Sequence, residues 1–248
     1  MSTNLKIPLQ RMSHPDLVAP PDTRPIELGE VWENPVTLER GVIVDLPWLN
    51  DEGRAVADLT AVPGTRVVGE HMHPALVESF SVQEGELTVL LDGRKSVLRA
   101  GERAEIEPGV WHDWRNEGDV AAIVRVEITP GERFVHMIET LFGLAREGHV
   151  NKRGMPHPLQ LALFATEFSD VVVFRKPPAA VQRVLFSILA PLARRRGYRA
   201  TYPSLSRTTL APRLPATLSR TERLGWEDRQ RRTIYSSLGV LGVRESDG

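Results

Sequence analysis

The sequence predicts a mainly β fold, of sandwich, barrel or jelly-roll type, followed by an α-helical region. Three observations support this prediction. Short apolar runs alternate with Gly-containing turns from about residue 35 to residue 129. After Pro130-Gly131 the apolar residues recur at every third or fourth position, which indicates helices. The two ends of the chain are rich in Pro and polar residues and show neither period.

The expected strands are short, and each lies between turn signals. Asp92-Gly93, which separates two of them, is typical of a tight β-hairpin. Many short strands at regular spacing, with no helix between them, indicate an all-β unit. The expected strands are 36–46, 55–62, 66–73, 78–83, 87–91, 96–99, 104–107, 112–116 and 120–128.

Three helical stretches follow, at 132–146, 158–174 and 178–196. The second can end in extended chain, because Val171, Val172 and Val173 are β-branched. The chain is therefore divided into an N-terminal arm (1–34), a β-barrel (35–131), a helical extension (132–199) and a basic tail rich in Ser, Thr, Arg and Pro (200–248).

Composition limits the possible functions. The absence of Cys excludes disulfides, Fe–S clusters and thiol nucleophiles, so His, Asp or Glu must hold any metal. The chain lacks both the apolar run of a secretory signal and a stretch long enough to span a membrane, so a cytoplasmic protein is expected.

Charge is distributed unevenly along the chain. Residues 1–150 carry 14 Lys+Arg and 25 Asp+Glu, whereas residues 151–248 carry 17 and 7. The basic part is expected to pack on the acidic part or on a partner subunit, with peripheral membrane contact through the helix at 178–196 as an alternative. A nucleic-acid partner is not expected, because no helix-turn-helix or aromatic stacking platform is recognisable.

The clearest chemistry lies around His71 and His73. Two His at positions i and i+2 of a strand project from the same face, so they can bind one metal ion. Pro74 ends that strand, and Glu78 returns on the next strand beside the His pair. His112, after a Pro-Gly turn, is the candidate for a third nitrogen ligand. Two blander interpretations stay open: the His side chains line an empty barrel, or the Glu caps a turn or pairs with a nearby Arg.

This segment resembles the first motif of the cupin superfamily. That motif reads Gly, five residues, His-x-His, three or four residues, Glu, six residues, Gly. The spacing of His71, His73, Glu78 and Gly85 matches it, while Gly64 lies one residue further upstream than the motif asks.

A later segment resembles the second cupin motif, which reads Gly, five residues, Pro-x-Gly, two residues, His, three residues, Asn. Gly101, Gly109, His112 and Asn116 match, whereas Pro108 directly precedes Gly109. The departures in both motifs concern turn residues, and the resemblance covers about residues 40–130.

The resemblance implies a cupin-type jelly-roll β-barrel with one metal ion in its mouth, bound by His71, His73, Glu78 and His112. It also implies a single-cupin chain, which is expected to form a homodimer. The ion is expected to be divalent Fe, Mn, Ni, Co or Zn, because soft sulfur ligands for copper(I) are absent.

Such a site leaves coordination positions open for a small-molecule substrate. A dioxygenase is the leading expectation, with Glu78 as general base, followed by an isomerase, epimerase or lyase. The alternative is a non-catalytic metal or small-molecule binding module with a docking extension. An apolar pocket lined by Phe80, Val67, Val89 and Ile106 favours an apolar or aromatic substrate over a sugar phosphate.

Two further expectations depend on strand phase. Arg125, Glu127 and Thr129 share one face of the last strand and are candidate pocket groups. Trp111 and Trp114, which flank His112, are expected to point away from the metal into the packing, with a place in the pocket as the alternative.

Overall fold

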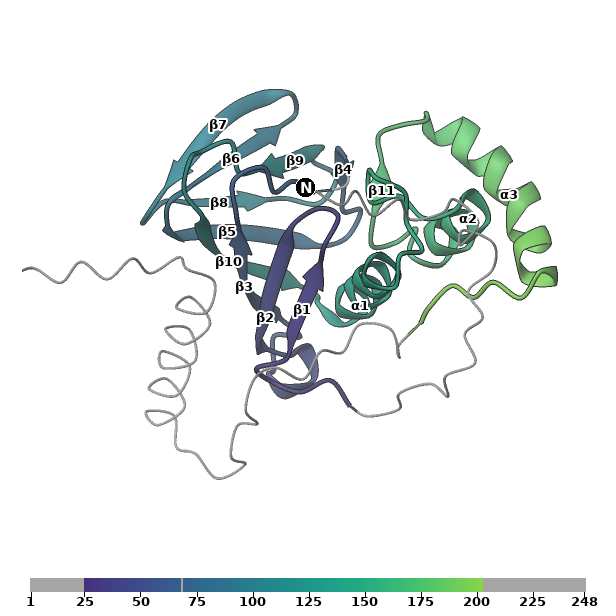
Figure 1. Cartoon of the computed structure of the whole chain (residues 1–248), viewed down its shortest axis with the longest axis horizontal. Coiled ribbons are helices and arrows are strands. Elements are labelled where there is room, and N and C mark those ends of the chain that lie inside the picture. The colour runs from purple at the N-terminus through teal and green to yellow at the C-terminus, as the bar shows by residue number, and fades with distance from the viewer. Residues whose placement is uncertain (1–24, 68, 203–248) are drawn as a thin grey trace, which may run out of the picture.

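Two antiparallel sheets face each other in the computed structural model, which describes residues 25–67 and 69–202 (Figure 1). A helical region lies to one side of them. The mainly β fold with a C-terminal helical region is therefore confirmed. The two sheets are not joined into a closed barrel, so the β unit is an open jelly-roll sandwich. Expectations for the first 24 residues and for 203–248 lie outside the described residues.

The first sheet has the strand order β1-β2-β3-β10-β5-β8, and the second has the order β11-β4-β9-β6-β7. The strands of the first sheet are β1 (Val31–Asn34), β2 (Glu39–Asp45), β3 (Ala55–Ala61), β10 (Ala122–Thr129), β5 (Val77–Glu84) and β8 (Arg103–Ile106). Those of the second are β11 (Val173–Phe174), β4 (His71–Met72), β9 (His112–Arg115), β6 (Glu86–Leu91) and β7 (Arg94–Arg99). A short 3-10 helix, η2 (Pro47–Leu49), follows β2.

The first sheet begins earlier than expected. The predicted strand at 36–46 is replaced by the hairpin of β1 and β2, and β1 starts at Val31 within the stretch expected to be an arm. The reason is local: the side-chain carbonyl of Asn34 accepts hydrogen bonds from the backbone of Val36 and Thr37, and Leu38 adopts a positive φ of 67°. These contacts turn the chain within the predicted strand.

The predicted strand at 66–73 is also shorter in the structure. Only His71 and Met72 form β4, preceded by an isolated bridge at Arg66. Gly69 adopts a φ of 84°, which extended chain cannot accommodate, so the strand restarts after it.

Apolar side chains from both sheets meet between the layers. The alternation of strand residues sends one set inward. The buried set includes Leu59, Phe80, Val82, Leu87 and Trp114. This cluster fixes the two sheets face to face, and it leaves the end near β4 for polar side chains.

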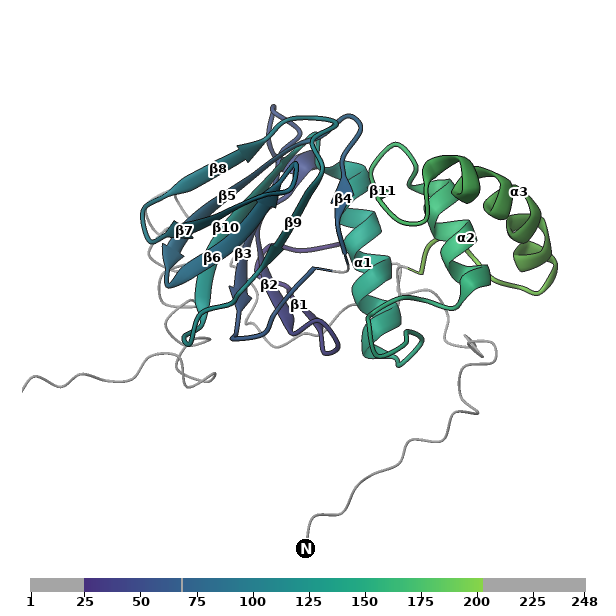
Figure 2. The ribbon, with the colours of Figure 1, turned by 90° about the horizontal axis from the view of Figure 1, so that it is seen from above.

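Helix α1 (Glu132–Arg146) begins directly after β10, as predicted, and its buried face covers the open side of the sandwich (Figure 2). Its start approaches β3 so closely that a Cβ on Gly131 would lie 2.5 Å from the Cβ and backbone nitrogen of Ala55. The backbone N–H of Gly131 donates to the carbonyl of Gly53 at 2.7 Å. The helix packs with Val135, Met137 and Phe142 into a second apolar cluster, shared with β1, β2 and helix α2 (Pro158–Glu167).

The second predicted helical stretch divides into α2 (Pro158–Glu167) and the short strand β11. The chain leaves the helix before the three consecutive Val residues, of which only Val173 lies in the strand. β11 pairs with β4, with Phe174 opposite His71. The helical region therefore contributes one strand to the second sheet.

Helix α3 (Ala179–Arg195) packs on α2 through Ala190 and Ala193. Its most apolar stripe faces outward instead: Val184 and Ile188 are 63% and 64% exposed. Among the described residues, no helix combines the length and apolar character that crossing a membrane requires. The homodimer and the peripheral membrane contact stay predictions.

Candidate metal centre

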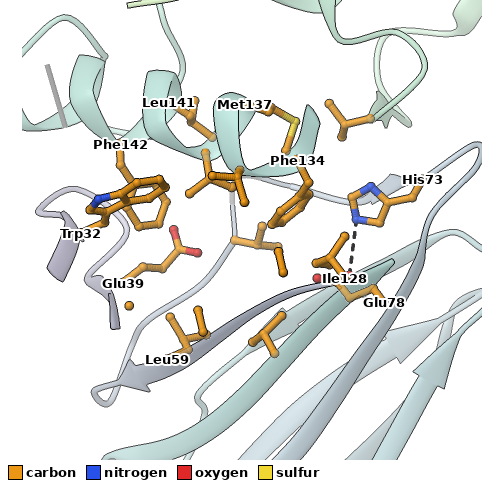
Figure 3. A pocket seen from close by; sticks show the side chains of 18 of the residues that line it. Trp32, Glu39, Leu59, His73, Glu78, Ile128, Phe134, Met137, Leu141 and Phe142 are labelled. Atoms are coloured by element: carbon orange, nitrogen blue, oxygen red, sulfur yellow. Dashed lines mark ion pairs between the residues drawn. The ribbon is translucent and has the colours of Figure 1, made fainter. Parts of the chain in front are cut away.

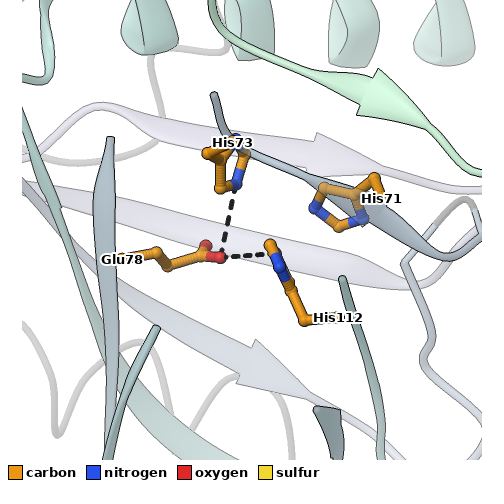
Figure 4. Close-up of side chains that lie close together, drawn as sticks. All are labelled: His71, His73, Glu78 and His112. Atoms are coloured by element: carbon orange, nitrogen blue, oxygen red, sulfur yellow. Dashed lines mark ion pairs between the residues drawn. The ribbon is translucent and has the colours of Figure 1, made fainter. Parts of the chain in front are cut away.

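Four polar side chains converge at one end of the sandwich (Figure 4). His71 on β4 lies directly opposite His112 on β9, and His73 follows β4 by one residue. Glu78 reaches the same point from β5, in the facing sheet. One ligating atom from each residue lies within 4.8 Å of the others, and all four residues are buried. The structure therefore brings the four predicted ligand residues together.

Local turns place these residues. Gly109 follows Pro108 with a φ of 83°, and its N–H donates to the carbonyl of His73 at 2.8 Å. This bond connects the turn before His112 to the His pair. Asn116 closes the other end of β9, because its side-chain NH₂ donates to the carbonyls of Ala61 and Val120. The second motif thus contains one ligand candidate and residues that hold its strand.

In each of the three His side chains, the ring nitrogen that points away from the cluster is hydrogen-bonded to a backbone carbonyl. The Nδ1–H of His71 donates to Gly69 at 3.0 Å, that of His73 to Val171 at 2.7 Å, and that of His112 to Val110 at 3.0 Å. A carbonyl can only accept, so each Nδ1 carries the proton. In the neutral ring, the Nε2 lone pair is then free to bind a cation.

The inner atoms have no hydrogen-bond partner of their own. Among the described residues, Nε2 of His73, Nε2 of His112 and Oε2 of Glu78 are buried without one. The two nitrogens nevertheless lie 3.4 Å and 3.0 Å from that carboxylate oxygen. Lone pairs that face one another at these distances need a shared cation or a proton between them. The donor set therefore fits a divalent metal ion.

The pKa shifts of the cluster residues also fit a metal site. Burial, together with the neighbouring His112 and His73, lowers the pKa of His71 to about 3. Burial alone would raise the pKa of Glu78, but the adjacent His112 and His73 outweigh that effect and hold the pKa below its usual range. Burial also lowers the pKa of His112, yet the Glu78 carboxylate makes the net direction upward. A carboxylate that stays ionised beside a neutral His71 suits a metal site.

The helical region is part of this centre. The carbonyl that accepts the proton of His73 belongs to Val171, between α2 and β11. Phe134 of α1 packs edge-on against the His73 ring at 5.8 Å. Arg175 follows β11 and pairs with Glu70 at 2.6 Å, with its guanidinium 5.4 Å from the centre of the Trp111 ring. The extension thus orients and shields one predicted ligand.

A cavity of about 150 Å³ extends from the cluster between the sandwich and α1 (Figure 3). His71, His73 and Glu78 lie at one end of it. The walls are apolar and aromatic, and α1 supplies one complete side, including Phe134 and Phe142. A cavity of about this volume holds roughly one benzene-sized ring.

The predicted pocket residues are divided between this cavity and the core. Phe80 and Val67 line the cavity. Val89 and Ile106 do not line it and pack only in the apolar cluster between the sheets. Trp114 lines the cavity as well as the core, since it shares the phase of His112.

The last strand of the β unit, β10, directs the other set of alternate residues inward from the one that was expected. Val126 and Ile128 line the cavity, not Arg125, Glu127 or Thr129. The Nε–H of Arg125 donates to Asp58 at 2.9 Å. The apolar Val124, Val126 and Ile128 alternate with these three polar residues, so the sequence itself indicated the inward phase.

Glu39 is a cavity residue that the sequence reasoning missed. It is buried at the start of β2, and its carboxylate accepts a hydrogen bond from the hydroxyl of Thr37. Burial raises its pKa to about 7 against the lowering effect of Thr37, and the charge of Glu78 adds to the rise. The available signal was its phase: Glu39, Gly41 and Ile43 alternate on the inward face of a predicted strand.

Comparison with known proteins gives a family match limited to the β unit. A family model described as a cupin domain matches residues 58–132, a range that contains all four candidate ligands. Among curated proteins, no match is found.

Several solved structures are similar over the same part of the chain. A conserved protein with a double-stranded β-helix domain from Klebsiella pneumoniae is 26% identical, with 44% of this chain and 83% of that chain covered and a TM-score of 0.33. A predicted oxalate decarboxylase from Thermotoga maritima is 20% identical, with 37% and 79% covered and a TM-score of 0.35. The Cnp3 cupin domain of Schizosaccharomyces pombe is 11% identical, with 37% and 64% covered and a TM-score of 0.33. The chain thus spans less than two thirds of the Cnp3 domain, and these similarities say nothing about a substrate.

Three findings bear on the family of this chain. Residues 58–132 match the cupin family model. Both spaced motifs lie in that range, and their four polar residues meet in one buried cluster. The chain therefore contains a cupin domain at residues 58–132.

Proposed function

We propose that this cupin is a metal-dependent enzyme that acts on a small apolar or aromatic molecule, with dioxygenase chemistry as the leading reaction class. One observation carries the proposal: a buried cluster of three imidazoles and one carboxylate, with its unpartnered atoms turned inward, lies at the end of an apolar cavity. A purely structural cluster of buried polar groups would satisfy its own hydrogen bonds.

The cavity walls support the substrate class. Among the described residues, neither Lys nor Arg lines the cavity, so a phosphate group would find no cationic side chain there. Trp32, Phe80, Phe134 and Phe142 instead provide aromatic surface. Such walls suit a single-ring molecule better than a sugar phosphate.

The protein residues have separate tasks in this proposal. A divalent metal would supply Lewis acidity, and a redox-active one would also supply electrons to oxygen. His71, His73 and His112 would hold it, because their Nδ1 protons are fixed on carbonyls. Glu78 would accept a proton from an acidic O–H or C–H of the bound molecule. Phe134 and the other apolar wall residues would keep bulk water away from that proton transfer.

Oxygen uptake by the full chain tests the reaction class. The chain is stripped of metal, reloaded separately with Fe(II), Mn(II), Ni(II), Co(II) or Zn(II), and assayed with one-ring catechols, phenols and enolisable ketones. We expect oxygen uptake that depends on the organic compound with one of the redox-active metals. The substitution Glu78→Gln should reduce it by about 100-fold or more, whereas His136→Ala, on the exposed face of α1, should not.

Two results would redirect the proposal. Conversion of a compound without oxygen uptake, detected by mass spectrometry, would indicate an isomerase or a lyase. Stoichiometric metal without conversion of any compound would instead favour a binding module.

A further inference from the structure

The end of the cavity remote from the metal cluster carries one buried acid. Figure 3 shows Glu39 below Trp32 and Phe142, with Phe134 and Ile128 between it and the pair of His73 and Glu78. The cavity therefore has two polar ends separated by an apolar middle. A molecule that fills it would meet the metal ligands at one end and Glu39 at the other.

Glu39 has few interactions for a buried carboxyl group. In the described part of the chain, its side chain accepts one hydrogen bond, from the hydroxyl of Thr37, and no Lys or Arg lines the cavity. The other charged or titratable residues of the cavity wall are Asp45, Glu78, His71 and His73. A metal ion at the cluster would pair with Glu78, but the other two acids, Glu39 and Asp45, would still have no cation within the cavity. A buried acid in apolar surroundings favours either the protonated form or a cation brought by a ligand.

Asp45 is less suited to that task than Glu39. It lies at the end of β2 and is only partly buried, and its carboxylate accepts a hydrogen bond from the backbone N–H of Leu46 at 2.8 Å. Glu39 is 8% exposed and lies in the aromatic part of the cavity. Trp32 turns its Nε1–H to Glu30 at 3.1 Å, so the rest of its indole is left to face a ligand.

We infer that Glu39 and Trp32 bind the amino group of the substrate, a small aromatic or apolar molecule with a protonated amine at the end remote from the metal. The carboxylate would accept the N–H bonds, and the aromatic face would stabilise the positive charge. The substrate class inferred here rests on the proposed function, because the other end of the molecule is taken to lie at the metal site. The cavity volume limits the molecule to about one ring with a short amine arm.

Binding of two matched probes to the zinc-loaded full chain tests the inference, because zinc is not redox-active and does not support oxygen chemistry. The probes are 2-phenylethylamine and 2-phenylethanol, which differ only in the polar group, and the method is isothermal titration calorimetry. We expect the amine to bind about 10-fold or more tightly than the alcohol. The substitution Glu39→Gln should abolish this preference and leave the zinc content unchanged. The matched control Asp45→Asn should keep the preference.

A second readout does not depend on a variant. At pH 7, binding of the ammonium should release protons from Glu39, which appears as a buffer-dependent heat, and binding of the alcohol should not. Equal binding of the two probes, binding of neither probe, or an amine preference that survives Glu39→Gln would overturn the inference. The proposed function can fail separately. If the chain bound no metal but still preferred the amine in a Glu39-dependent way, the amine site would be supported and the metal-dependent enzyme would not.

Discussion

At the scale of single residues, three protons decide what the cluster can hold. Each of His71, His73 and His112 directs its Nδ1–H to a backbone carbonyl, so each presents a lone pair inward. Glu78 adds a carboxylate from the facing sheet. The resulting space attracts a cation and repels any neutral apolar filling, which explains why four buried polar groups are compatible with a stable fold.

Glu39 gives a residue-scale prediction about pH. Its pKa rises from 4.5 to about 7 on folding, so the folded state favours the protonated acid. Its contribution to stability is fully present below about pH 4.5 and is lost as the pH rises through 7. In urea titrations at pH 8, the neutral Glu39→Gln variant should therefore have a free energy of unfolding up to about 3 kcal/mol higher than that of the wild type. At pH 4.5 the two proteins should be about equally stable. If the stability of the two proteins depended on pH in the same way, this would contradict a buried Glu39 with a raised pKa.

The sequence predicts some of these residues because their geometry is local. His71 and His73 are two positions apart, and their shared face follows from strand alternation alone. The carbonyl of Val171, which orients His73, is separated from it by 98 positions, and no local period reports such a contact. Glu39 lies between these cases, because its phase was readable but its cavity depends on α1.

At the scale of elements, the junction between β10 and α1 positions the cavity wall. Gly131 lets the helix start against β3, where a side chain would collide with Ala55. Helix α1 then lies over the open side of the sandwich (Figure 2). Its aromatic side chains, Phe134 and Phe142, line the cavity. The helical period of this segment was readable from the sequence, but its position over the cavity was not, because packing between elements has no signature in one chain.

The substitution Gly131→Ala tests that junction. The added Cβ would lie 2.5 Å from backbone and side-chain atoms of Ala55, so α1 or β3 must shift. We expect a loss of about 1–3 kcal/mol in the free energy of unfolding. Gly41→Ala is the matched control, since its Cβ would meet nothing within 4 Å. Equal stability of the two variants in urea titrations would argue against close packing of α1 on β3.

At the scale of the whole molecule, the helical region completes the β unit. It contributes a cavity wall through α1, a strand through β11 and an acceptor for His73 through Val171. The charge asymmetry of the chain indicated two parts but did not show how they meet. Their contact in the described residues is mainly apolar, through the cluster that includes Trp32, Ile128, Val135 and Phe168.

Two truncations separate these contributions. A chain ending at residue 131 loses the helices and β11, so it should expose the apolar cluster, aggregate, and bind metal at least about 10-fold more weakly. A chain ending at residue 177 keeps α1, α2 and β11 and should retain the metal. Light scattering and metal titration report the two properties. A soluble 1–131 chain with unchanged metal affinity would show that the extension is only peripheral.

The most direct test of the central claim is anomalous X-ray scattering from crystals of the full chain, collected at the absorption edge of the metal found by elemental analysis. We predict one peak between the two sheets, about 2.0–2.3 Å from Nε2 of His71, His73 and His112 and from the carboxylate of Glu78. The absence of a peak at these four residues in metal-supplemented crystals, or a peak only elsewhere on the chain, would contradict a metal centre in this cupin.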